Sequence, residues 1–217
     1  DCTVMGFGHA QDILIERVEI RNANNWHHIE LNACAHVTVR GCRFRGGQSV
    51  AYTGNEAIQI VAALGSTQFP WFGPYDDTHC QHILIDGNYF YQCGAGVGTH
   101  SEATVGNHFD IAIINNFFND LYYYAIVGLT WSGVRVINNR IQNAGGGVLF
   151  AQNTTRHNVD ILIADNTIYA IGLGTHPYNG RGIHLSGNSS YCCQHFRICN
   201  NFVGNVAGNA LYGITVD

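Results

Sequence analysis

The hydrophobic and polar positions along the chain follow a repeating pattern. Seven nine-residue segments carry apolar residues at their second, fourth and ninth places. Alternation with a period of two residues is typical of β-strands, in which successive side chains point to opposite faces. The segments are residues 12–20, 36–44, 82–90, 110–118, 133–141, 160–168 and 195–203.

Asparagine recurs at the seventh place of these segments. Asn tolerates turn conformations, and Asn amides can stack in ladders between parallel strands. We therefore predict that each segment bends at this place and that the amides lie above one another. The seventh residues in chain order are Val18, Cys42, Asn88, Asn116, Asn139, Asn166 and Asn201.

A further short apolar strand follows each segment, at residues 28–31, 57–60, 96–99, 125–128, 147–150, 182–185 and 210–213. The segment starts are separated by 24, 46, 28, 23, 27 and 35 residues. A period in the twenties with three strands per coil is typical of a parallel β-helix, because each coil buries its apolar face only by stacking on the next. We predict one all-β domain over residues 1–217, a single-stranded parallel β-helix of about seven coils.

A β-sandwich is the alternative arrangement of these strands. Its hairpins favour Asn-Gly turns between strands, but that dipeptide occurs at Asn179 and Gly180, inside one loop, and does not recur with the repeat. Neither end of the predicted stack carries an evident polar cap, and solenoids need caps for solubility. We expect further coils, or another copy of the chain in a homo-oligomer, to cover the ends.

The charge of the chain excludes some partners. All ten cationic residues are Arg, against 15 acidic residues, and the net charge is −5. No basic stripe is present, so we expect no nucleic-acid partner. No apolar run approaches the length that spans a bilayer, so we expect a soluble protein without a membrane partner. The chain opens without a signal peptide, so either a leader has been removed or the chain is a fragment.

The eight cysteines leave their pairing open. No CxxC pair is present, which disfavours a zinc ribbon. Cys34 and Cys80 each lie two residues before a segment, and stacked positions in neighbouring parallel strands are about 4.8 Å apart, within reach of a disulfide. A disulfide and a pair of packed thiols are both compatible with this placement. Cys192 and Cys193 are undecided in the same way.

Polar residues concentrate on one face of the predicted coil. The outward positions of the third strands are Glu30, Gln59, Gly98, Val127, Leu149 and His184. The loop at residues 61–81 and the loop at residues 99–109 leave this edge, and they bring Trp71, Phe72, Tyr75, Asp76, Asp77, His79, Glu102 and His108 to its rim. Aromatic rings beside carboxylates suit a polysaccharide, since paired acids can protonate a leaving oxygen and activate water.

The candidate catalytic residues are therefore four acids and two histidines: Glu30, Glu56, Asp76, Asp77, His100 and His108. The candidate substrate-binding residues are His28, Gln59, Trp71, Tyr75 and Glu102. Other roles stay open for several of them. Glu56 falls at an inward position, where a carboxylate can serve loop amides instead of a substrate, and Asp76 and Asp77 suit Asx-turns. His28 either flanks Glu30 or faces solvent.

A metal site is the rival use of the same residues. His100, His108 and a loop Asp can hold a transition ion, and oxygen-rich loops can hold calcium. No spacing in the sequence is diagnostic of either site. We therefore predict no required cofactor, with calcium as the alternative.

Several motifs together resemble a known family. Residues 56–60, residues 69–76 with Thr78 and Cys80, residues 96–101 with His108, and residues 28–32 are similar to the core of secreted, pectate-lyase-like β-helix proteins of bacteria and phages. The resemblance covers about residues 12–150. It implies a right-handed coil, a secreted or extracellular location, and a polysaccharide groove.

The resemblance also suggests which positions carry the chemistry. Glu30, Glu56, Asp76, His100 and His108 match the positions to carry over. The chain departs from the family at two places, because Val61 stands where members tend to have Asp and Val127 where they tend to have Arg.

Three functions follow in order of preference. The first is a glycoside hydrolase that cuts a neutral or weakly charged polysaccharide with paired carboxylates. The second is a polysaccharide lyase or uronan epimerase, which needs a cation over the groove, whereas Arg40, Arg43 and Arg45 belong to other strands. The third is a non-catalytic glycan-binding or structural β-helix module, which Val61 and Val127 favour.

Overall fold

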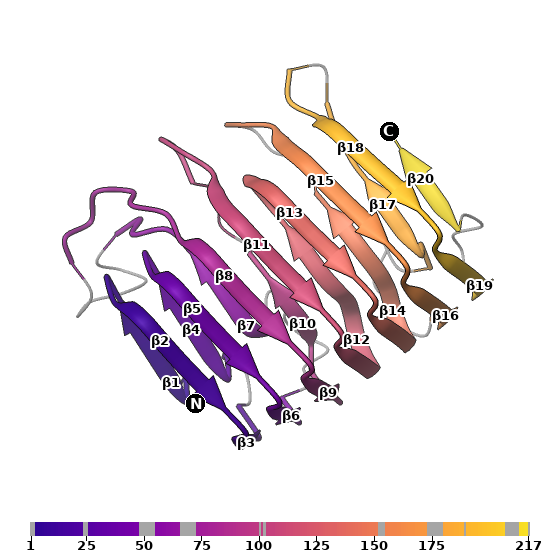
Figure 1. The fold of residues 1–217 in the computed structure, drawn as a ribbon, viewed down its shortest axis with the longest axis horizontal. Coiled ribbons are helices and arrows are strands. Elements are labelled where there is room, and N and C mark those ends of the chain that lie inside the picture. The colour runs from indigo at the N-terminus through magenta and orange to yellow at the C-terminus, as the bar shows by residue number, and fades with distance from the viewer. Residues whose placement is uncertain are drawn as a thin grey trace.

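The chain winds into a parallel β-helix (Figure 1). The computed structural model describes residues 3–23, 26–47, 55–65, 73–99, 101, 103–151, 155–172, 180–188, 190–206 and 213–216. Within these ranges all regular structure is β-strand, and neighbouring coils pair in parallel, as Ile29 with Ile58 and Val136 with Ile163. The predicted fold class, a right-handed parallel β-helix of about seven coils, is confirmed. None of the described segments forms a helix that is long and apolar enough to cross a bilayer.

Three faces make up each coil. The first face is a seven-stranded sheet of β2 (Gln11–Glu16), β5 (Ala35–Arg40), β8 (Gln81–Asp86), β11 (His108–Ile114), β13 (Trp131–Ile137), β15 (Asn158–Ala164) and β18 (Cys193–Cys199). The second face is formed by β3 (Glu19–Arg21), β6 (Arg43–Arg45), β9 (Tyr89–Tyr91), the beginnings of β12 (Phe117–Gly128) and β14 (Arg140–Phe150), β16 (Thr167–Ile171) and β19 (Phe202–Val206).

The third face is formed by β1 (Met5–Gly8), β4 (Ile29–Asn32), β7 (Glu56–Val61), β10 (Ala95–Gly98), the ends of β12 and β14, β17 (Ile183–Leu185) and β20 (Ile214–Val216). The second and third faces belong to one sheet because β12 and β14 run through the corner between them.

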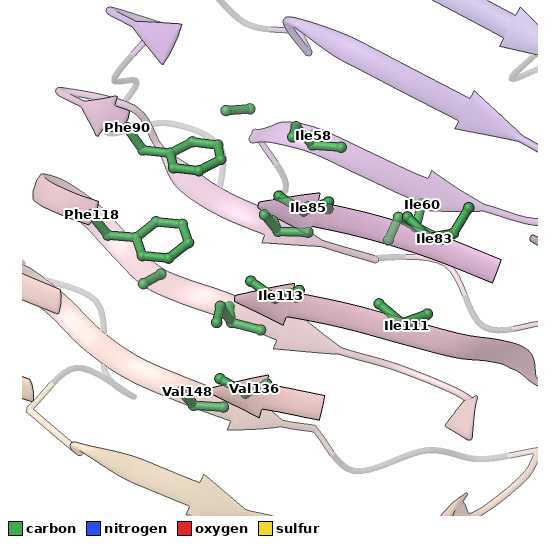
Figure 2. Packing of buried hydrophobic residues seen from close by; sticks show 14 of the residues in the cluster. Ile58, Ile60, Ile83, Ile85, Phe90, Ile111, Ile113, Phe118, Val136 and Val148 are labelled. Carbon is green, nitrogen blue, oxygen red and sulfur yellow. The ribbon is translucent and has the colours of Figure 1, made fainter. Parts of the chain in front are cut away.

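The core fills the inside of the coil with columns of like residues. Apolar places of the sequence repeat are buried, as Ile83, Ile85 and Phe90 show in the third full coil. Phe44, Phe90 and Phe118 stack face to face, with ring centroids 4.8 and 4.6 Å apart. Figure 2 shows Phe90 and Phe118 one above the other, beside isoleucines from the first and third faces. Each coil therefore buries its apolar side chains against the coils on either side of it.

The predicted asparagine ladder is present at the corner between the first and second faces. The Asn116 Oδ1 accepts hydrogen bonds from the backbone N–H and the Nδ2 of Asn88, at 2.9 and 3.0 Å. The Asn116 Nδ2 donates in turn to the Ile85 carbonyl and to the Asn139 Oδ1, at 2.9 and 3.1 Å. Cys42 occupies this position in the coil before Asn88, and its N–H donates to the Asn88 Oδ1. The buried amides thus satisfy backbone N–H and carbonyl groups at the bend.

A second inward column lies at the corner between the third and first faces. Its members are Cys34, Cys80, His108, Trp131, Asn158 and Cys193, and the strand register aligns them from coil to coil. Three of them accept a backbone N–H from the coil before: the Cys80 Sγ from Cys34 at 3.3 Å, the His108 Nδ1 from Cys80 at 3.1 Å, and the Asn158 Oδ1 from Trp131 at 3.0 Å. We call this the mixed ladder.

The cysteines within the described ranges are thiols. All seven cysteines in the described ranges are free, including Cys34, Cys80, Cys192 and Cys193. Of the two alternatives for Cys34 and Cys80, the packed pair of thiols is therefore the one observed. Burial raises the pKa of Cys80 to about 12, and the pKa of Cys34 is raised for the same reason.

Candidate functional site

The candidate site predicted from the sequence lies on the outer side of the third face. The strand register aligns the expected row of Glu30, Gln59, Gly98, Val127, Leu149 and His184. Only Glu30 is partly exposed, and the other five are buried. The Glu30 carboxylate accepts a hydrogen bond of 2.9 Å from the Thr3 hydroxyl. Polar groups are thus present at the first coils of this row but are largely withdrawn from solvent.

Glu56 faces outward, so its expected inward position is wrong. The two residues after it, Ala57 and Ile58, both join the main core, whereas its pairing partner Ala95 belongs to a separate outer cluster. A Cβ added to Gly98 would lie 2.8 Å from the Glu56 Cγ, which places the carboxylate side chain over that glycine. Two consecutive inward residues break the alternation of faces at the start of the strand. Counting alternate residues back from Ile58 therefore assigns Glu56 to the wrong face.

The Glu56 side chain is only 1% exposed although it faces outward. The His27 Nδ1 lies 3.6 Å from one carboxylate oxygen and 2.8 Å from the Glu56 backbone carbonyl. Such burial beside a histidine favours a structural ion pair or hydrogen bond over an acid that meets a substrate.

The two loop aspartates hold the loops in shape. The Asp76 Oδ1 accepts the Thr78 N–H at 3.0 Å in an Asx-type turn. Hydrogen bonds from the Thr78 side chain and, second, from its N–H lower the pKa of Asp76. The Asp77 Oδ2 accepts the N–H and the hydroxyl of Thr104, at 2.8 and 2.6 Å, and also the N–H of Val105. The carboxylate of Asp77 therefore joins the loop at residues 61–81 to the loop at residues 99–109.

The two described histidines of the prediction are buried rather than placed at the rim. His108 is fully buried in the mixed ladder, and this burial, with a smaller effect of nearby His79, lowers the pKa of His108 to about 3. The N–H of Cys80 donates to its Nδ1, so the imidazole is neutral and carries its proton on Nε2. His28 is 2% exposed, which contradicts the solvent-facing alternative, and burial lowers the pKa of His28 to about 4.

The predicted substrate-binding residues are divided by exposure. Tyr75 is 38% exposed and remains reachable from solvent, whereas Gln59 is 1% exposed. Trp71, His100 and Glu102 lie outside the described residues. In the part of the chain that the structure describes, no three His, Cys, Asp or Glu side chains are grouped to hold a metal ion.

A polar cluster that the sequence reasoning did not single out lies on the first face. The His82 Nδ1 contacts the Asp110 Oδ2 at 2.9 Å, and the Arg135 Nη2 donates to the Asp110 Oδ1 at the same distance. These contacts, with that of His82 the largest, lower the pKa of Asp110. The His36 and His82 rings stack 4.7 Å apart. His36, His82 and Asp110 occupy one register position on neighbouring coils, and Arg135 reaches Asp110 from a position two residues further along β13. His82, Asp110 and Arg135 line a shallow depression of about 450 Å³.

Outward-facing aromatic and arginine side chains on the second face were also missed. They come from the eighth residue of each repeat segment and from the residue after its end, which flank the buried ninth place. Examples are Arg43 and Arg45 on β6, and Tyr89 and Tyr91 on β9. Aligning the outward places of this strand, as was done for the third strand, would have revealed them.

Comparisons with known proteins agree on the fold. The chain is similar to two solved structures of PfbA, a surface adhesin of Streptococcus pneumoniae, with TM-scores of 0.77 and 0.66 at 18% and 17% sequence identity. The matches cover 96% and 97% of this chain, and 52% and 68% of the respective PfbA chains. The chain thus spans about half the length of the first. No protein-family model and no curated protein sequence matches it.

Proposed function

We propose that this chain is a non-catalytic glycan-binding module of a surface or secreted protein. The observation that carries the proposal is the state of the predicted catalytic acids. Glu56 is 1% exposed beside His27, and Asp76 and Asp77 accept hydrogen bonds from the loops that hold them. Retaining and inverting glycosidases both need two carboxylates that meet the sugar and water, about 5 to 10 Å apart. A binding module has no such requirement.

The remaining outward row of the third face also fits binding better than cleavage. Beyond Glu30 it continues with Gln59, Gly98, Val127, Leu149 and His184, all buried. Cleavage of a glycosidic bond also needs a second carboxylate opposite the first, and this row supplies none beyond Glu30. The likeness of the fold to a surface adhesin supports a module that attaches to a surface, and with it an extracellular location.

The test separates binding from turnover. The chain is incubated with a panel of neutral and acidic polysaccharides, binding is measured by titration calorimetry, and products are followed by mass spectrometry. We expect binding to at least one polysaccharide without new reducing ends or unsaturated products. Products that disappear in Glu30→Gln or Asp76→Asn would establish the hydrolase or lyase instead. Absence of binding to every polysaccharide would refute a glycan-binding role.

A further inference from the structure

The outer side of the second face carries two straight columns of side chains. Neighbouring coils pair residue for residue, so the side chains stand above one another at the spacing of parallel strands. The first column contains Glu19, Arg43, Tyr89, Phe117, Arg140, Thr167 and Phe202, and the second contains Arg21, Arg45, Tyr91, Asn119, Gln142, Tyr169 and Gly204. We call this surface the second-face platform.

Aromatic rings form the middle of the platform. The rings of Tyr89 and Tyr91 lie 6.1 Å apart and nearly parallel, and the rings of Tyr89 and Phe117 lie 5.2 Å apart. All three side chains are half-buried, so part of each ring meets solvent. No inner packing requires aromatic residues at outward positions, since the core is filled by the residues between them, such as Phe90.

Arginines surround these rings. The Arg45 guanidinium lies 5.6 Å from the centroid of Tyr91, and that of Arg140 lies 5.2 Å from the centroid of Phe117. The Arg140 Nη2 also donates to the Tyr169 hydroxyl at 2.8 Å. Contacts of this kind hold a guanidinium over a ring and leave its edge N–H groups free to meet an anion.

The charge of the platform is opposite to that of the whole chain. The chain has a net charge of −5, but the platform has four Arg and a single acid, Glu19, which contacts Arg21. Within the described ranges, Arg43 and Arg45 have no carboxylate at ion-pair distance. Glu19, Arg43, Phe44, Arg45, Tyr89 and Tyr91 line a shallow depression of about 460 Å³.

We infer that the second-face platform binds an acidic polysaccharide, whose sugar rings stack on Tyr89 and Tyr91 while its carboxylate or sulfate groups pair with Arg43 and Arg45. The inference rests on the proposed glycan-binding function and adds the face and the ligand class. Charge complementarity selects an anionic ligand, and guanidinium groups recognise carboxylate and sulfate oxygens through paired N–H groups.

A polysaccharide fits this surface better than an acidic protein. Protein partners anchor aromatic or arginine residues in well-packed, desolvated pockets, and the platform offers a shallow depression and a flat row. A nucleic acid would meet only four cations on a chain of negative net charge, whereas its binding strength comes from neutralising many phosphates. A surface that repeats from coil to coil suits a ligand that repeats from sugar to sugar.

The experiment uses the full chain and three probes, namely a polyuronate, heparin as the sulfated glycan, and neutral dextran. We expect the chain to bind at least one of the two anionic polymers, more weakly as salt is raised, and to bind dextran much more weakly. Arg43→Gln and Arg45→Gln should each weaken anionic binding about tenfold, because each removes a charge-assisted contact. Tyr91→Leu should weaken it by a similar factor.

Matched controls come from the first face. Arg197→Gln removes an exposed arginine of β18, and Phe109→Leu removes an exposed ring of β11, and neither should change anionic binding. Thermal unfolding of each variant confirms that it folds. Equal losses in the controls, or no loss in Arg43→Gln and Arg45→Gln, would overturn the assignment to this face.

The remaining outcomes separate the two levels of the proposal. Binding to dextran alone would overturn the acidic ligand and leave a glycan-binding module intact. If the chain binds neither these three probes nor any polysaccharide of the wider panel, both the acidic ligand and the glycan-binding function would be overturned. Poly-glutamate with the same number of charges per polymer as the polyuronate serves as a further probe. If it binds as tightly as the anionic polysaccharides, the platform recognises acidic protein segments, and a carbohydrate ligand would be overturned.

Discussion

The two inward ladders perform the same task with different residues. In the asparagine ladder, five coils use the same side chain to accept a backbone N–H from the neighbouring coil, as Asn116 does from Asn88. In the mixed ladder, a thiol, an imidazole and an amide accept the equivalent hydrogen bond. The acceptors Cys80, His108 and Asn158 take it from the N–H groups of Cys34, Cys80 and Trp131 in that order. The comparison teaches that different side chains can supply the acceptor at a bend in a β-helix. Where Trp131 supplies none, the Thr130 carbonyl accepts the His108 N–H instead.

The difference between the ladders also explains a functional misreading. The same residue at the same place of each repeat is visible in the sequence, so the Asn column indicates a structural role. Cys80, His108 and Trp131 look unrelated to one another, so His108 reads as a candidate base. Its burial and its bond to Cys80 show that it belongs to the scaffold.

The largest expected effect is at the centre of the asparagine ladder. Asn116→Ala leaves the N–H of Asn88 and the carbonyl of Ile85 without their buried partners. We expect a loss of about 4 kcal/mol in the free energy of unfolding, measured by urea denaturation. Asn201→Ala, at the partly exposed end of the ladder, should cost about half as much because water can replace the lost amide. Equal losses would show that burial does not set the strength of the ladder.

The mixed ladder should be weaker at its equivalent position. Asn158→Ala removes the acceptor for the Trp131 N–H and the donor to the Ala151 carbonyl. Fewer hydrogen bonds are lost than in Asn116→Ala, so we expect a decrease of about 2 to 3 kcal/mol in the free energy of unfolding. Urea denaturation of both variants under the same conditions measures the ratio. A loss larger than that of Asn116→Ala would reverse the ranking of the two ladders.

The mixed ladder also predicts a pH dependence that the asparagine ladder lacks. The pKa of His108 is about 3 in the folded chain and 6.5 in its ordinary environment, so between these values the unfolded chain binds more protons. Stability is therefore complete above about pH 6.5 and decreases as the pH falls towards 3, and from pH 6.5 to 4.5 we expect a loss of about 2 kcal/mol.

The variant His108→Gln keeps an acceptor for the Cys80 N–H but does not titrate, so its stability curve should be flatter over this range. His195→Gln, an exchange at an exposed histidine of the first face, is the control and should follow the wild type. Buried His28, whose pKa is about 4, contributes in the same direction, so a residual slope remains. An unchanged slope in His108→Gln would contradict the buried neutral imidazole.

The smallest expected effect concerns the thiols of the mixed ladder. Cys34 and Cys80 are free, so adding a reductant should leave the unfolding temperature unchanged. Buried Cys80 and Cys93, whose pKa values are raised to about 12, should resist a thiol reagent until the chain unfolds. Mass spectrometry after alkylation without reduction counts the reactive thiols. A mass that shows Cys34 joined to Cys80 would replace this part of the ladder with a covalent bridge.

The repeat made the fold predictable from the sequence. Apolar places such as Ile83, Ile85 and Phe90 recur with a period of two, and the Asn column fixes the register between coils. The outward row of the third face followed from the same alignment. The alignment assigns Glu56 to the wrong face because Ala57 and Ile58 both point inward. This irregularity breaks the alternation but does not change the hydrophobic pattern of the sequence.

The site was less predictable than the fold. Asp77 accepts hydrogen bonds from Thr104 and Val105, which lie in another loop. No local sequence pattern predicts a contact between residues so far apart in the chain. The second-face platform was within reach of the sequence, since its residues flank the ninth place of each segment. Arg43, Tyr89 and their neighbours carry binding chemistry rather than proton transfer, so a criterion based on acidic residues does not select them.

The corner that carries the asparagine ladder has one further consequence. In every described coil two residues separate the first-face strand from the second-face strand, and the first of the two has a positive φ, as Gly87 and Asn115 do. All variation in coil length therefore falls at the other two corners. A cut at this corner removes a whole coil cleanly: deleting residues 116–138 would join Asn115 to Asn139 and preserve the sequence of turn and ladder. The length of the solenoid can thus be edited in units of one coil, and with it the number of sugar units that the second-face platform spans.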